Sequence, residues 1–423
     1  MSGLRICMLT TFYPPYAFGG DAIGVQRLSR ALVRRGHDVT VVHDTDGFRA
    51  LHSGPIAERP EIDTDEGVKV VRLRSRAGAL SSLLVQQLGR PVLHAPQLRR
   101  ILRPGQFDVV NYHNVSLIGG PGLLGYGRDA ITLYMAHEHW LVCPTHVLWR
   151  FRKERCDERK CLRCVVSYRR PPQLWRYTGA LERAIDRVDT VIAMSEFSRE
   201  KHRQFGLKTP MQVLPYFLPD GAPALPDGDR SPQARPFVFF AGRLERIKGL
   251  DDIIPVFARF PEIDLVIAGD GEHAGVLRGI AGEMPNVRFL GRLAPEALTA
   301  YYRHALASLV PSVCYETFGI VLIEAFRQGT PVIARRVGPF PEIIERSGAG
   351  ALFSTIDEFE TALRRFQGDP SWRRQLSYAG EAAVREHWSE AVVVPKYLDL
   401  VRDAAQRRGH ERVVNLLAQQ EVM

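Results

Sequence analysis

Two glutamates, Glu316 and Glu324, lie eight residues apart in the segment SLVPSVCYETFGIVLIEAFRQGTPVIA (residues 308–334). The pattern predicts a strand that ends near Pro311, a turn that contains glycine, and a helix that begins near Gly319. If every intervening residue were helical, the two carboxylates would lie about 12 Å apart. That separation suits contacts with both ends of one elongated ligand. The alternative is an ordinary amphipathic helix with two surface glutamates.

The start of this predicted helix offers backbone donors. The amides of Gly319, Ile320 and Val321 belong to the first turn, and the first turn of a helix leaves its N–H groups without partners inside the helix. Such amides form a site for an anion. We therefore expect a phosphate to bind here, between two groups that carry hydroxyls.

Two cations follow a second apolar run, FVFFAGRLERIKGL (residues 237–250). The run predicts a buried strand that ends at Gly242, after which Arg243 and Lys248 lie in a loop that opens a helix. Cations at the carboxyl end of a strand can neutralise a diphosphate and stabilise it as a leaving group. The alternative is solvated surface charge, which is the usual state of arginine and lysine.

Four of the six cysteines cluster in one segment. Cys143, Cys156, Cys161 and Cys164 are separated by 12, 4 and 2 residues, so the last pair forms Cys-x-x-Cys. Four thiolates would complete a closed tetrahedral zinc site, which is structural because no position stays open for a substrate. So few cysteines are typical of a reducing cytoplasm, where clustered cysteines more often bind metal than one another. The alternatives are free thiols, or disulfides in an exported protein.

The same region carries most of the net charge. Lys plus Arg number 56 and Asp plus Glu 47, a net charge of +9, and residues 149–176 contribute +7 of it. Aromatic residues are interleaved with this charge, namely Trp140, Trp149, Tyr168, Trp175 and Tyr177. Basic and interfacial aromatic residues suit an anionic membrane surface or a lipid-diphosphate acceptor. Nucleic acid can be bound by the same chemistry, and a solvated face of a zinc loop is a further alternative. We favour the membrane, because the loop follows directly after His137 at a predicted strand end.

Strands and helices must hold these residues in place. Apolar β-rich runs alternate with helical segments in the first half of the chain, at residues 5–10, 37–42, 67–73, 107–113, 130–136 and 190–195. Between the first two runs, residues 22–37 have apolar side chains at helical spacing, and Gly36 suits the C-terminal cap. Continuous apolar strands joined by helices are typical of a parallel sheet covered on both faces. The first half therefore predicts a doubly wound α/β domain.

Proline then interrupts the alternation. Six prolines fall within residues 215–236, and proline lacks an amide donor and restricts the residue before it, so we expect a linker there. Strand-like runs resume at 237–242, 263–269, 287–291, 307–311 and 331–334, with helical segments at 249–260 and 295–305. We expect two Rossmann-like α/β domains that face each other across a cleft. Their predicted bounds are residues 1–214, with a Cys-rich basic insertion at about 140–177, and residues 237–385; a helical segment at 386–423 is expected to pack back on the first domain.

Length and composition agree with this architecture. The chain has 423 residues, of which 45% are hydrophobic and 24% charged, which is ordinary for a globular protein and excludes disorder, collagen and coiled coil as the main structure. No apolar run approaches the ~20 residues that span a bilayer. The short apolar stretch at the N-terminus predicts a buried strand and not a signal peptide. We expect a cytoplasmic protein associated with the inner face of the membrane.

Six segments, in order along the chain, resemble glycosyltransferase family 4. They read TTFYPPYAFGGDAIGVQRLSRALVRRGHDVTVV, VIAMSEFSREKHRQFG, FAGRLERIKGLDDII, LVIAGDGEH, VRFLGRL and ETFGIVLIEAFRQGTPVIA, and the resemblance covers nearly the whole chain. It implies the GT-B fold of two facing Rossmann-like domains. It also implies a retaining enzyme that uses a nucleotide-sugar donor.

The resemblance implies a role for individual residues. Arg243 and Lys248 match the pair that binds the donor's pyrophosphate. Glu324 matches a glutamate that hydrogen-bonds the ribose, and Glu316 matches one near the hydroxyls of the donor sugar. His137 matches a histidine that reaches the donor sugar from the N-terminal domain, whereas its alternative is a satisfied core histidine.

The implied sites are as follows. The catalytic set is His137, Glu316, Arg243 and Lys248. The donor-binding set is Gly19, Gly20, Gly242, Arg243, Lys248, Glu316, Phe318, Gly319, Ile320, Val321 and Glu324. In this set, Gly19 and Gly20 match a glycine-rich loop that approaches the phosphates and the acceptor from the other domain. Glu138 and His139 lie next to His137, and the sequence does not distinguish their roles from each other.

The chain departs from the family pattern at one place. Where the family usually has two glycines before Pro-Glu, this chain has Gly338, Pro339 and Phe340. Proline removes an amide, and we expect phenylalanine to add bulk near the donor sugar. The sequence therefore leaves open whether the donor is a UDP- or a GDP-sugar.

The sequence as a whole predicts a retaining glycosyltransferase that moves a sugar from a nucleotide diphosphate to a lipid-linked or cell-envelope glycan. We expect no catalytic metal, because fixed cations and amides can hold the departing diphosphate. The alternatives are a GT-B nucleotide-sugar epimerase or hydrolase, a non-catalytic nucleotide-sugar-binding protein, and a nucleic-acid-binding protein, of which the last is not favoured. A Rossmann dehydrogenase is disfavoured, because FGGDAIG is not Gly-x-Gly-x-x-Gly.

Overall fold

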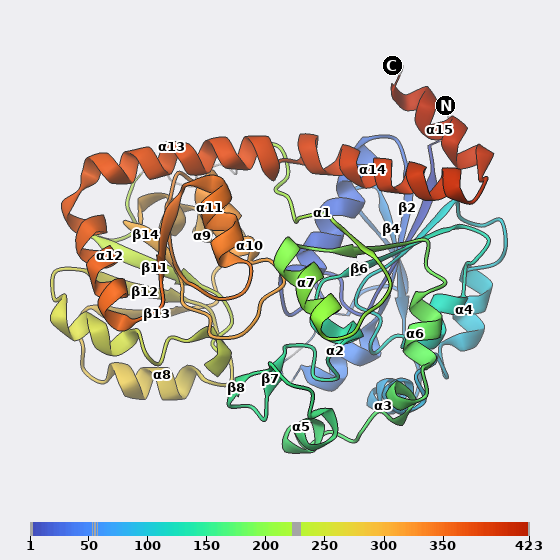
Figure 1. The fold of residues 1–423 in the computed structure, drawn as a ribbon, viewed down its shortest axis with the longest axis horizontal. Coiled ribbons are helices and arrows are strands. Elements are labelled where there is room, and N and C mark those ends of the chain that lie inside the picture. The colour runs from blue at the N-terminus through green and yellow to red at the C-terminus, as the bar shows by residue number, and fades with distance from the viewer. Residues whose placement is uncertain (1–2, 53, 55, 57, 222–229, 422–423) are drawn as a thin grey trace. The chain divides into compact units, whose positions relative to one another are not determined.

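The computed structural model describes residues 3–52, 54, 56, 58–221 and 230–421. Contacts divide the chain into two units, each built on its own sheet (Figure 1). Unit 1 comprises Met1–Tyr216 and Val393–Met423, and unit 2 comprises Phe217–Val392. The division between Tyr216 and Phe217 falls inside the predicted linker at 215–236, of which residues 222–229 lie outside the described residues.

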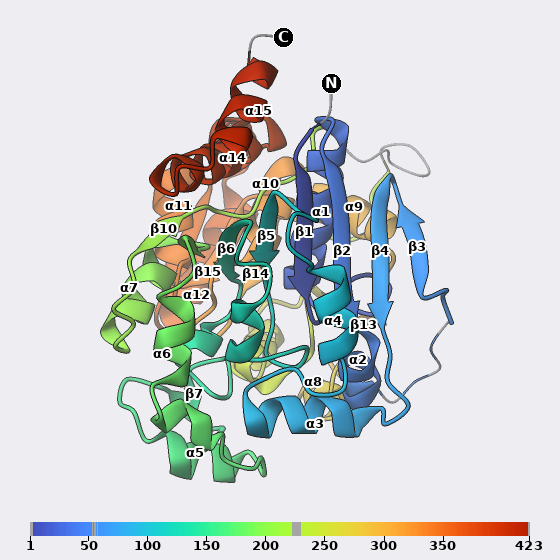
Figure 2. The same cartoon turned by 90° about the vertical axis from the view of Figure 1, so that its right-hand side faces the viewer.

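The sheet of unit 1 has eight strands in the order β10-β9-β6-β5-β1-β2-β4-β3 (Figure 2). Their bounds are β1 (Arg5–Thr10), β2 (Asp38–Asp44), β3 (Ile62–Asp65), β4 (Val68–Leu73), β5 (Val109–Tyr112), β6 (Ile131–Ala136), β9 (Thr190–Ala193) and β10 (Met211–Val213). All neighbours are parallel except β3, which runs antiparallel to β4 at one edge. The strands that follow β1 in the sequence are first added on one side of it, beginning with β2, and later on its other side, beginning with β5. The strand order therefore reverses between β1 and β5.

The sheet of unit 2 has six parallel strands in the order β13-β12-β11-β14-β15-β16. Their bounds are β11 (Phe237–Ala241), β12 (Asp264–Ala268), β13 (Val287–Gly291), β14 (Ala307–Val310), β15 (Val332–Arg335) and β16 (Gly350–Phe353). The strand order reverses between β11 and β14. In open α/β sheets, ligands bind beyond the carboxyl ends of the strands at such a reversal.

Helices connect the strands of both sheets. In unit 1 they are α1 (Gly20–Arg34), α2 (Thr45–Leu51), α3 (Ala79–Leu88), α4 (Ala95–Ile101), α5 (Cys161–Ser167), α6 (Ala180–Ile185) and α7 (Glu196–Gln204). In unit 2 they are α8 (Ala274–Ala281), α9 (Pro295–His304), α10 (Ile320–Arg327), α11 (Phe340–Ser347), α12 (Ile356–Gly368) and α13 (Pro370–His387). Helix α14 (Glu390–Arg407) leads from unit 2 into unit 1, and α15 (Glu411–Glu421) follows it.

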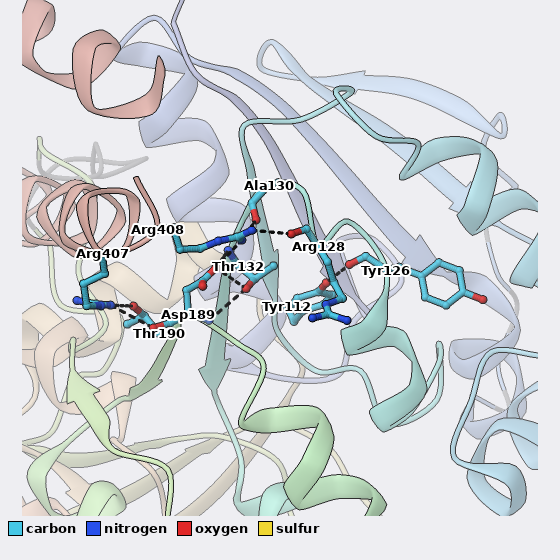
Figure 3. Close-up of polar contacts among 9 residues, drawn as sticks. All are labelled: Tyr112, Tyr126, Arg128, Ala130, Thr132, Asp189, Thr190, Arg407 and Arg408. Carbon is cyan, nitrogen blue, oxygen red and sulfur yellow. Dashed lines mark hydrogen bonds and ion pairs between the residues drawn. The ribbon is translucent and has the colours of Figure 1, made fainter. Parts of the chain in front are cut away.

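The last helices are anchored to the sheet of unit 1 through two arginines (Figure 3). Arg408, just after α14, donates hydrogen bonds to the carbonyl oxygens of Ala130 (2.7 Å) and Arg128 (2.9 Å) and pairs with Asp189 (3.1 Å). Arg407 donates to the hydroxyl of Thr190 (3.0 Å). These contacts fasten the C-terminal end of α14 to the loops that precede β6 and β9.

Each strand-like run of the sequence forms a strand, but one predicted helix does not form. Residues 249–260 instead contain a turn and the 3-10 helix η5 (Ile254–Arg259). Pro255 is the physical reason, because proline cannot donate the amide bond that an α-helix needs. The loop after β11 likewise contains only the short 3-10 helix η4 (Arg246–Lys248). The described part of the chain contains no helix that is long and apolar enough to cross a membrane.

Candidate active site

The strongest candidate site lies in unit 2, where the strand order reverses. Strands β11 and β14 are neighbours in the sheet although about 65 residues separate them in the sequence. The loop after β11 carries Arg243 and Lys248, and the loop after β14 carries Glu316. Parallel strands end at the same edge of a sheet, so the topology brings these two loops together.

Lys248 and Glu316 are in direct contact. The Lys248 ammonium nitrogen lies 2.5 Å from Glu316 Oε1, and the hydroxyl of Ser312 donates a hydrogen bond of 3.0 Å to the same oxygen. Burial alone would disfavour the charged form of both side chains. The opposite charge of the partner outweighs burial in each case, so the pKa of Lys248 is raised and the pKa of Glu316 is lowered. The side chains are 19% and 23% exposed, so both are charged and within reach of a ligand.

The two loops are held in register by the backbone. The amide of Val313 donates a hydrogen bond of 2.9 Å to the carbonyl oxygen of Ile247. Gly249 ends η4 with φ +71°, and a Cβ atom there would lie 2.2 Å from the carbonyl oxygen of Pro311. Only glycine allows both that conformation and that approach, so Gly249 fixes the distance between the loops.

Helix α10 begins where the sequence predicts. Gly319 is its N-cap with φ +102°, and the amides of the first turn follow at Ile320 and Val321. Glu324 is half-buried on the same helix. The ring of Phe340 is fully buried and packs against Gly319, so it is not exposed beside this helix.

The other predicted residues of unit 2 lie in the same loops. Arg243 is 52% exposed and pairs with Glu245 at 2.6 Å. Its charge favours ionised Glu316 and disfavours charged Lys248, so the three groups share one electrostatic environment. Gly242 donates its amide to the carbonyl oxygen of Ala268. The ring of Phe318 is buried against Trp388, so this residue can offer a ligand its backbone and not its ring.

In unit 1, the glycines at the start of α1 follow β1, beside the other strand-order reversal. Gly19 is the N-cap of α1, and Gly20 is its first residue. Asn114, after β5, donates a hydrogen bond of 3.3 Å to Asp21 in the first turn of α1. This contact joins the segments that follow β1 and β5, as expected for strands on the two sides of a reversal.

His137 follows β6 and is buried within unit 1. Its Nδ1 atom lies 2.5 Å from the hydroxyl of Tyr216, and its Nε2 atom lies 2.8 Å from Nδ1 of His113. Burial lowers the pKa of His137 to about 4 and that of His113 far below its usual value. Both rings are therefore neutral at physiological pH. Both ring nitrogens of His137 are thus already engaged. A contact between one of them and a sugar would have to replace the hydrogen bond to Tyr216 or the one to His113.

Sequence reasoning missed the two partners of His137. His113 was detectable, because it ends an apolar run just as His137 does. Tyr216 carried no local signal, because it lies 79 residues away in the proline-rich segment. The structure also separates the neighbours of His137: His139 packs inside against His202, and Glu138 pairs with His146 at 2.8 Å.

The aromatic residues of the basic insertion are mostly core residues, which corrects the sequence interpretation. Trp140, Trp149 and Trp175 are 1%, 8% and 9% exposed, so they cannot form an interfacial surface. The guanidinium of Arg176 lies 4.7 Å from the ring centroid of Trp175, and burial lowers its pKa to about 10. Tyr177 is exposed, as predicted for a surface aromatic.

Another buried charge cluster lies at the carboxyl end of β2. His94 Nε2 is 3.4 Å from Asp44 and 3.3 Å from Asp46, and all three side chains are at most 2% exposed. Burial disfavours a charged ring, but both carboxylates outweigh it and raise the pKa of His94 to about 9. Asp44 also accepts the amides of Asp46 and Gly47 as the N-cap of α2. The cluster is thus a buried ion-pair network beside the start of α2.

Two families of known proteins match the two halves of this architecture. The family described as "Glycosyltransferase Family 4" matches residues 18–219, and the family described as "Glycosyl transferases group 1" matches residues 224–383. The chain belongs to glycosyltransferase family 4. It is therefore an enzyme that transfers glycosyl groups.

Relatives of this family 4 glycosyltransferase align over most of its length. A glycosyltransferase of Methanocaldococcus jannaschii is 24% identical over 432 residues, which cover 96% of this chain and 100% of the relative. The phosphatidyl-myo-inositol mannosyltransferase of Mycobacterium tuberculosis is 26% identical over 391 residues, or 89% of this chain and 92% of the relative.

Solved structures agree on the fold. Sucrose-phosphate synthase from Thermosynechococcus elongatus superposes with a TM-score of 0.69 at 20% identity, covering 95% of this chain and 98% of that one. HepE from Anabaena, solved in complex with UDP-glucose, superposes with a TM-score of 0.61 at 17% identity, covering 96% and 100%. At such identities the likeness establishes the fold, which is GT-B, with two parallel Rossmann-like sheets.

Proposed function

We propose that this glycosyltransferase is a retaining enzyme that moves a sugar from a UDP- or GDP-sugar to a lipid-linked or cell-envelope glycan. The observation that carries the proposal is the Lys248–Glu316 pair beside the first turn of α10. A cation, a carboxylate and helix N-terminal amides, gathered where the strand order reverses, match the charge and the hydroxyls of a nucleotide sugar.

Each residue of unit 2 has a proposed task. Lys248 and Arg243 bind the diphosphate and stabilise its charge as the leaving group. Glu324 accepts hydrogen bonds from the ribose, and Glu316 accepts them from the sugar. The amides of Phe318, Gly319, Ile320 and Val321 complete the phosphate site. A lysine ammonium has three donors, so Lys248 can keep its contact with Glu316 while it binds a phosphate oxygen.

The proposed reaction is a front-side substitution. The bond between the sugar's anomeric carbon and the phosphate oxygen breaks, and a bond to the acceptor oxygen forms on the same face. The acceptor's proton passes to the departing phosphate, so no separate base is required. Catalysis is then mainly positioning and electrostatic stabilisation by Arg243, Lys248 and the α10 amides, and no catalytic metal takes part in the proposal.

Unit 1 contributes the acceptor side in this proposal. Gly19 and Gly20 leave the start of α1 without side-chain bulk; a Cβ at Gly19 would meet only the Asp21 carboxylate, at 3.4 Å. His137 approaches the sugar in its neutral form, which is supported by its lowered pKa. A neutral imidazole can donate one hydrogen bond to a hydroxyl without adding a charge.

Exposed apolar side chains of unit 1 support the proposal of a lipid-linked acceptor. Helix α5 exposes Leu162 (52%) and Val166 (58%) on one face, and α3 exposes Leu80 and Leu83. Both helices lie at the same end of unit 1 (Figures 1 and 2). We propose that this face contacts the anionic inner surface of the membrane, with nearby arginines attracted to lipid headgroups. The relative from Mycobacterium tuberculosis is named for a lipid acceptor, which agrees with this choice.

An experiment on turnover separates this proposal from its alternatives. The purified chain is incubated with UDP-, GDP- or ADP-sugars, with and without a lipid extract, and free nucleotide and glycolipid are measured. We expect one donor class to raise the thermal midpoint and to be consumed only with lipid, and NMR should show that the first product keeps the donor's anomeric configuration. Acceptor-independent hydrolysis or epimerisation would favour the alternative enzymes. Binding without turnover would favour a nucleotide-sugar-binding protein.

A further inference from the structure

The four clustered cysteines line one small cavity in the basic insertion. The cavity, of about 10 Å³, is lined by Cys143, Cys156, Cys161 and Cys164. That is roughly the room of one water-sized sphere. The cysteines come from three different places: Cys143 from the loop after β6, Cys156 from the position directly after strand β8 (Glu154–Arg155), and Cys161 and Cys164 from the first turn of α5. Figure 1 shows β7 (Trp149–Arg150), β8 and α5 side by side.

The elements around this cavity are too short to be stable alone. Strands β7 and β8 have two residues each, and α5 has seven. Isolated hairpins and helices of that size are marginal in water. Four non-glycine residues between positions 146 and 152 also have positive φ, namely His146 (75°), Leu148 (47°), Phe151 (54°) and Arg152 (61°). Such conformations persist only where the surroundings hold them.

Hydrogen-bond donors already face two of the sulfurs. The amide of Phe151 donates to Cys164 Sγ at 3.4 Å, and the hydroxyl of Thr145 lies 3.3 Å from Cys143 Sγ. Donors of this kind stabilise thiolate ligands of a metal. Cys156 Sγ lies 3.4 Å from the carbonyl oxygen of Glu158, a contact that a thiol makes and a thiolate would give up.

The surrounding charge fits an anionic metal centre. A divalent cation with four thiolates carries a net charge of about −2. Arg150 and Lys160 line the cavity, and they also pair with Glu154 and Glu158, so their positive charge is shared between these carboxylates and the centre. Part of the excess positive charge of this insertion then balances the centre that the insertion encloses.

We propose that Cys143, Cys156, Cys161 and Cys164 bind one structural zinc ion. Each thiol loses its proton to solvent, and the four sulfurs close around the ion in a tetrahedron. The ion cross-links the three short elements and supplies the stability that they lack. Because the amide of His139 donates to the carbonyl oxygen of His146, the ordered insertion also braces the segment after β6. The proposal is independent of the donor site in unit 2.

Metal analysis of the full chain tests this proposal. The protein is produced in zinc-supplemented medium and purified under reducing conditions without chelator. We expect about one zinc per chain, and X-ray absorption should show four sulfur ligands at ~2.3 Å. Less than about a tenth of a zinc per chain would overturn the proposal. Iron in place of zinc would also overturn it. A disulfide among the four cysteines, detected as a lower mass under non-reducing conditions, would overturn it as well.

Two variants and a matched control extend the test. Cys161→Ser and Cys164→Ser should each lose stoichiometric zinc, whereas Cys7→Ala, at a buried cysteine of β1 outside the cavity, should keep it. If the serine variants fail to fold, zinc is removed from the wild-type chain by chelation. Hydrogen exchange should then accelerate in residues 143–168 and stay unchanged in unit 2. Full zinc in the serine variants, or unchanged exchange after zinc removal, would contradict the proposal.

Discussion

Two charged residues of the candidate site, Lys248 and Glu316, are paired with each other and are still accessible to a ligand. The contact between Lys248 and Glu316 keeps both charged at the edge of the sheet. Without the carboxylate, burial would favour the neutral amine, which binds phosphate poorly. Glu316 therefore has a second task besides its proposed contact with the sugar, which is to maintain the charge of Lys248.

The donor site predicts the effect of two substitutions. Glu324→Gln removes an acceptor for the ribose, and Arg243→Ala leaves diphosphate charge uncompensated. A charge-assisted hydrogen bond contributes about 1.5–3 kcal/mol, so donor affinity measured by calorimetry should fall roughly tenfold to a hundredfold. Glu283→Gln, at an exposed glutamate of the same unit, is the control and should bind like the wild type. Wild-type affinity in both test variants would exclude the assigned donor site.

The environment of His137 predicts a stability effect. Tyr216→Phe removes the hydroxyl that lies 2.5 Å from Nδ1 of His137, so a buried polar atom loses a partner. We expect the free energy of unfolding in urea to fall by about 1–3 kcal/mol. Tyr378→Phe, at a tyrosine that is 70% exposed, should change it by less than about 0.5 kcal/mol. Equal effects of the two substitutions would mean that the His137–Tyr216 contact adds nothing to stability.

At the scale of elements, α2 is held by a cluster that titrates. The pKa of His94 is about 9 in the folded protein and about 6.5 when unfolded. The attraction between protonated His94 and the two carboxylates stabilises the fold fully below pH 6.5. This stabilisation is lost as the pH rises through 9, because His94 then loses its proton in the folded protein too. We expect the free energy of unfolding to fall by an amount on the order of 1–3 kcal/mol between pH 6.5 and 9.5.

The variant His94→Gln provides the matched control for this prediction. It should be less stable than the wild type at pH 6.5, because the two carboxylates lose their cation. It should also lack the decline at higher pH, because no group in the cluster titrates there. A decline of equal size in His94→Gln would assign the pH dependence to other groups.

Helix α5 carries the prediction on membrane contact. Replacing the exposed Leu162 and Val166 with serine removes apolar area from the proposed membrane face. In flotation assays with anionic vesicles, we expect the fraction bound to fall several-fold, and binding of the wild type should weaken as salt rises. Tyr378→Ser in unit 2 is the control. Unchanged binding of the double variant, or no binding by the wild type, would contradict the proposed membrane contact.

At the scale of the whole molecule, the alternation of strands and helices was predictable from the sequence, because buried parallel strands are short apolar runs such as Phe237–Ala241. The α-helix expected at residues 249–260 was wrong, because a 3-10 helix that has Pro255 in its first turn shows a similar apolar spacing. Sequence patterns also do not reveal strand order. The contact between Lys248 and Glu316 follows from the pairing of β11 with β14, which only the structure shows.

Burial was the other feature that the sequence left open. Trp140 and Trp175 are indistinguishable from Tyr177 in a basic, aromatic stretch, yet the two tryptophans are core residues and the tyrosine is exposed. Their burial depends on partners far along the chain. The indole of Trp175, for example, donates to the carbonyl oxygen of Gln86, 89 residues away. The roles of the site residues likewise followed from the family resemblance and not from burial or spacing.

The central claim is that unit 2 holds the nucleotide-sugar donor on the loops after β11 and β14 and on α10. Hydrogen exchange of the full chain, measured with and without a saturating donor identified by thermal shift, tests it most directly. We predict slower exchange in residues 242–249 and 312–324, and little change in α8 or α12 of the same unit. Saturated binding without slower exchange in either loop would contradict the account.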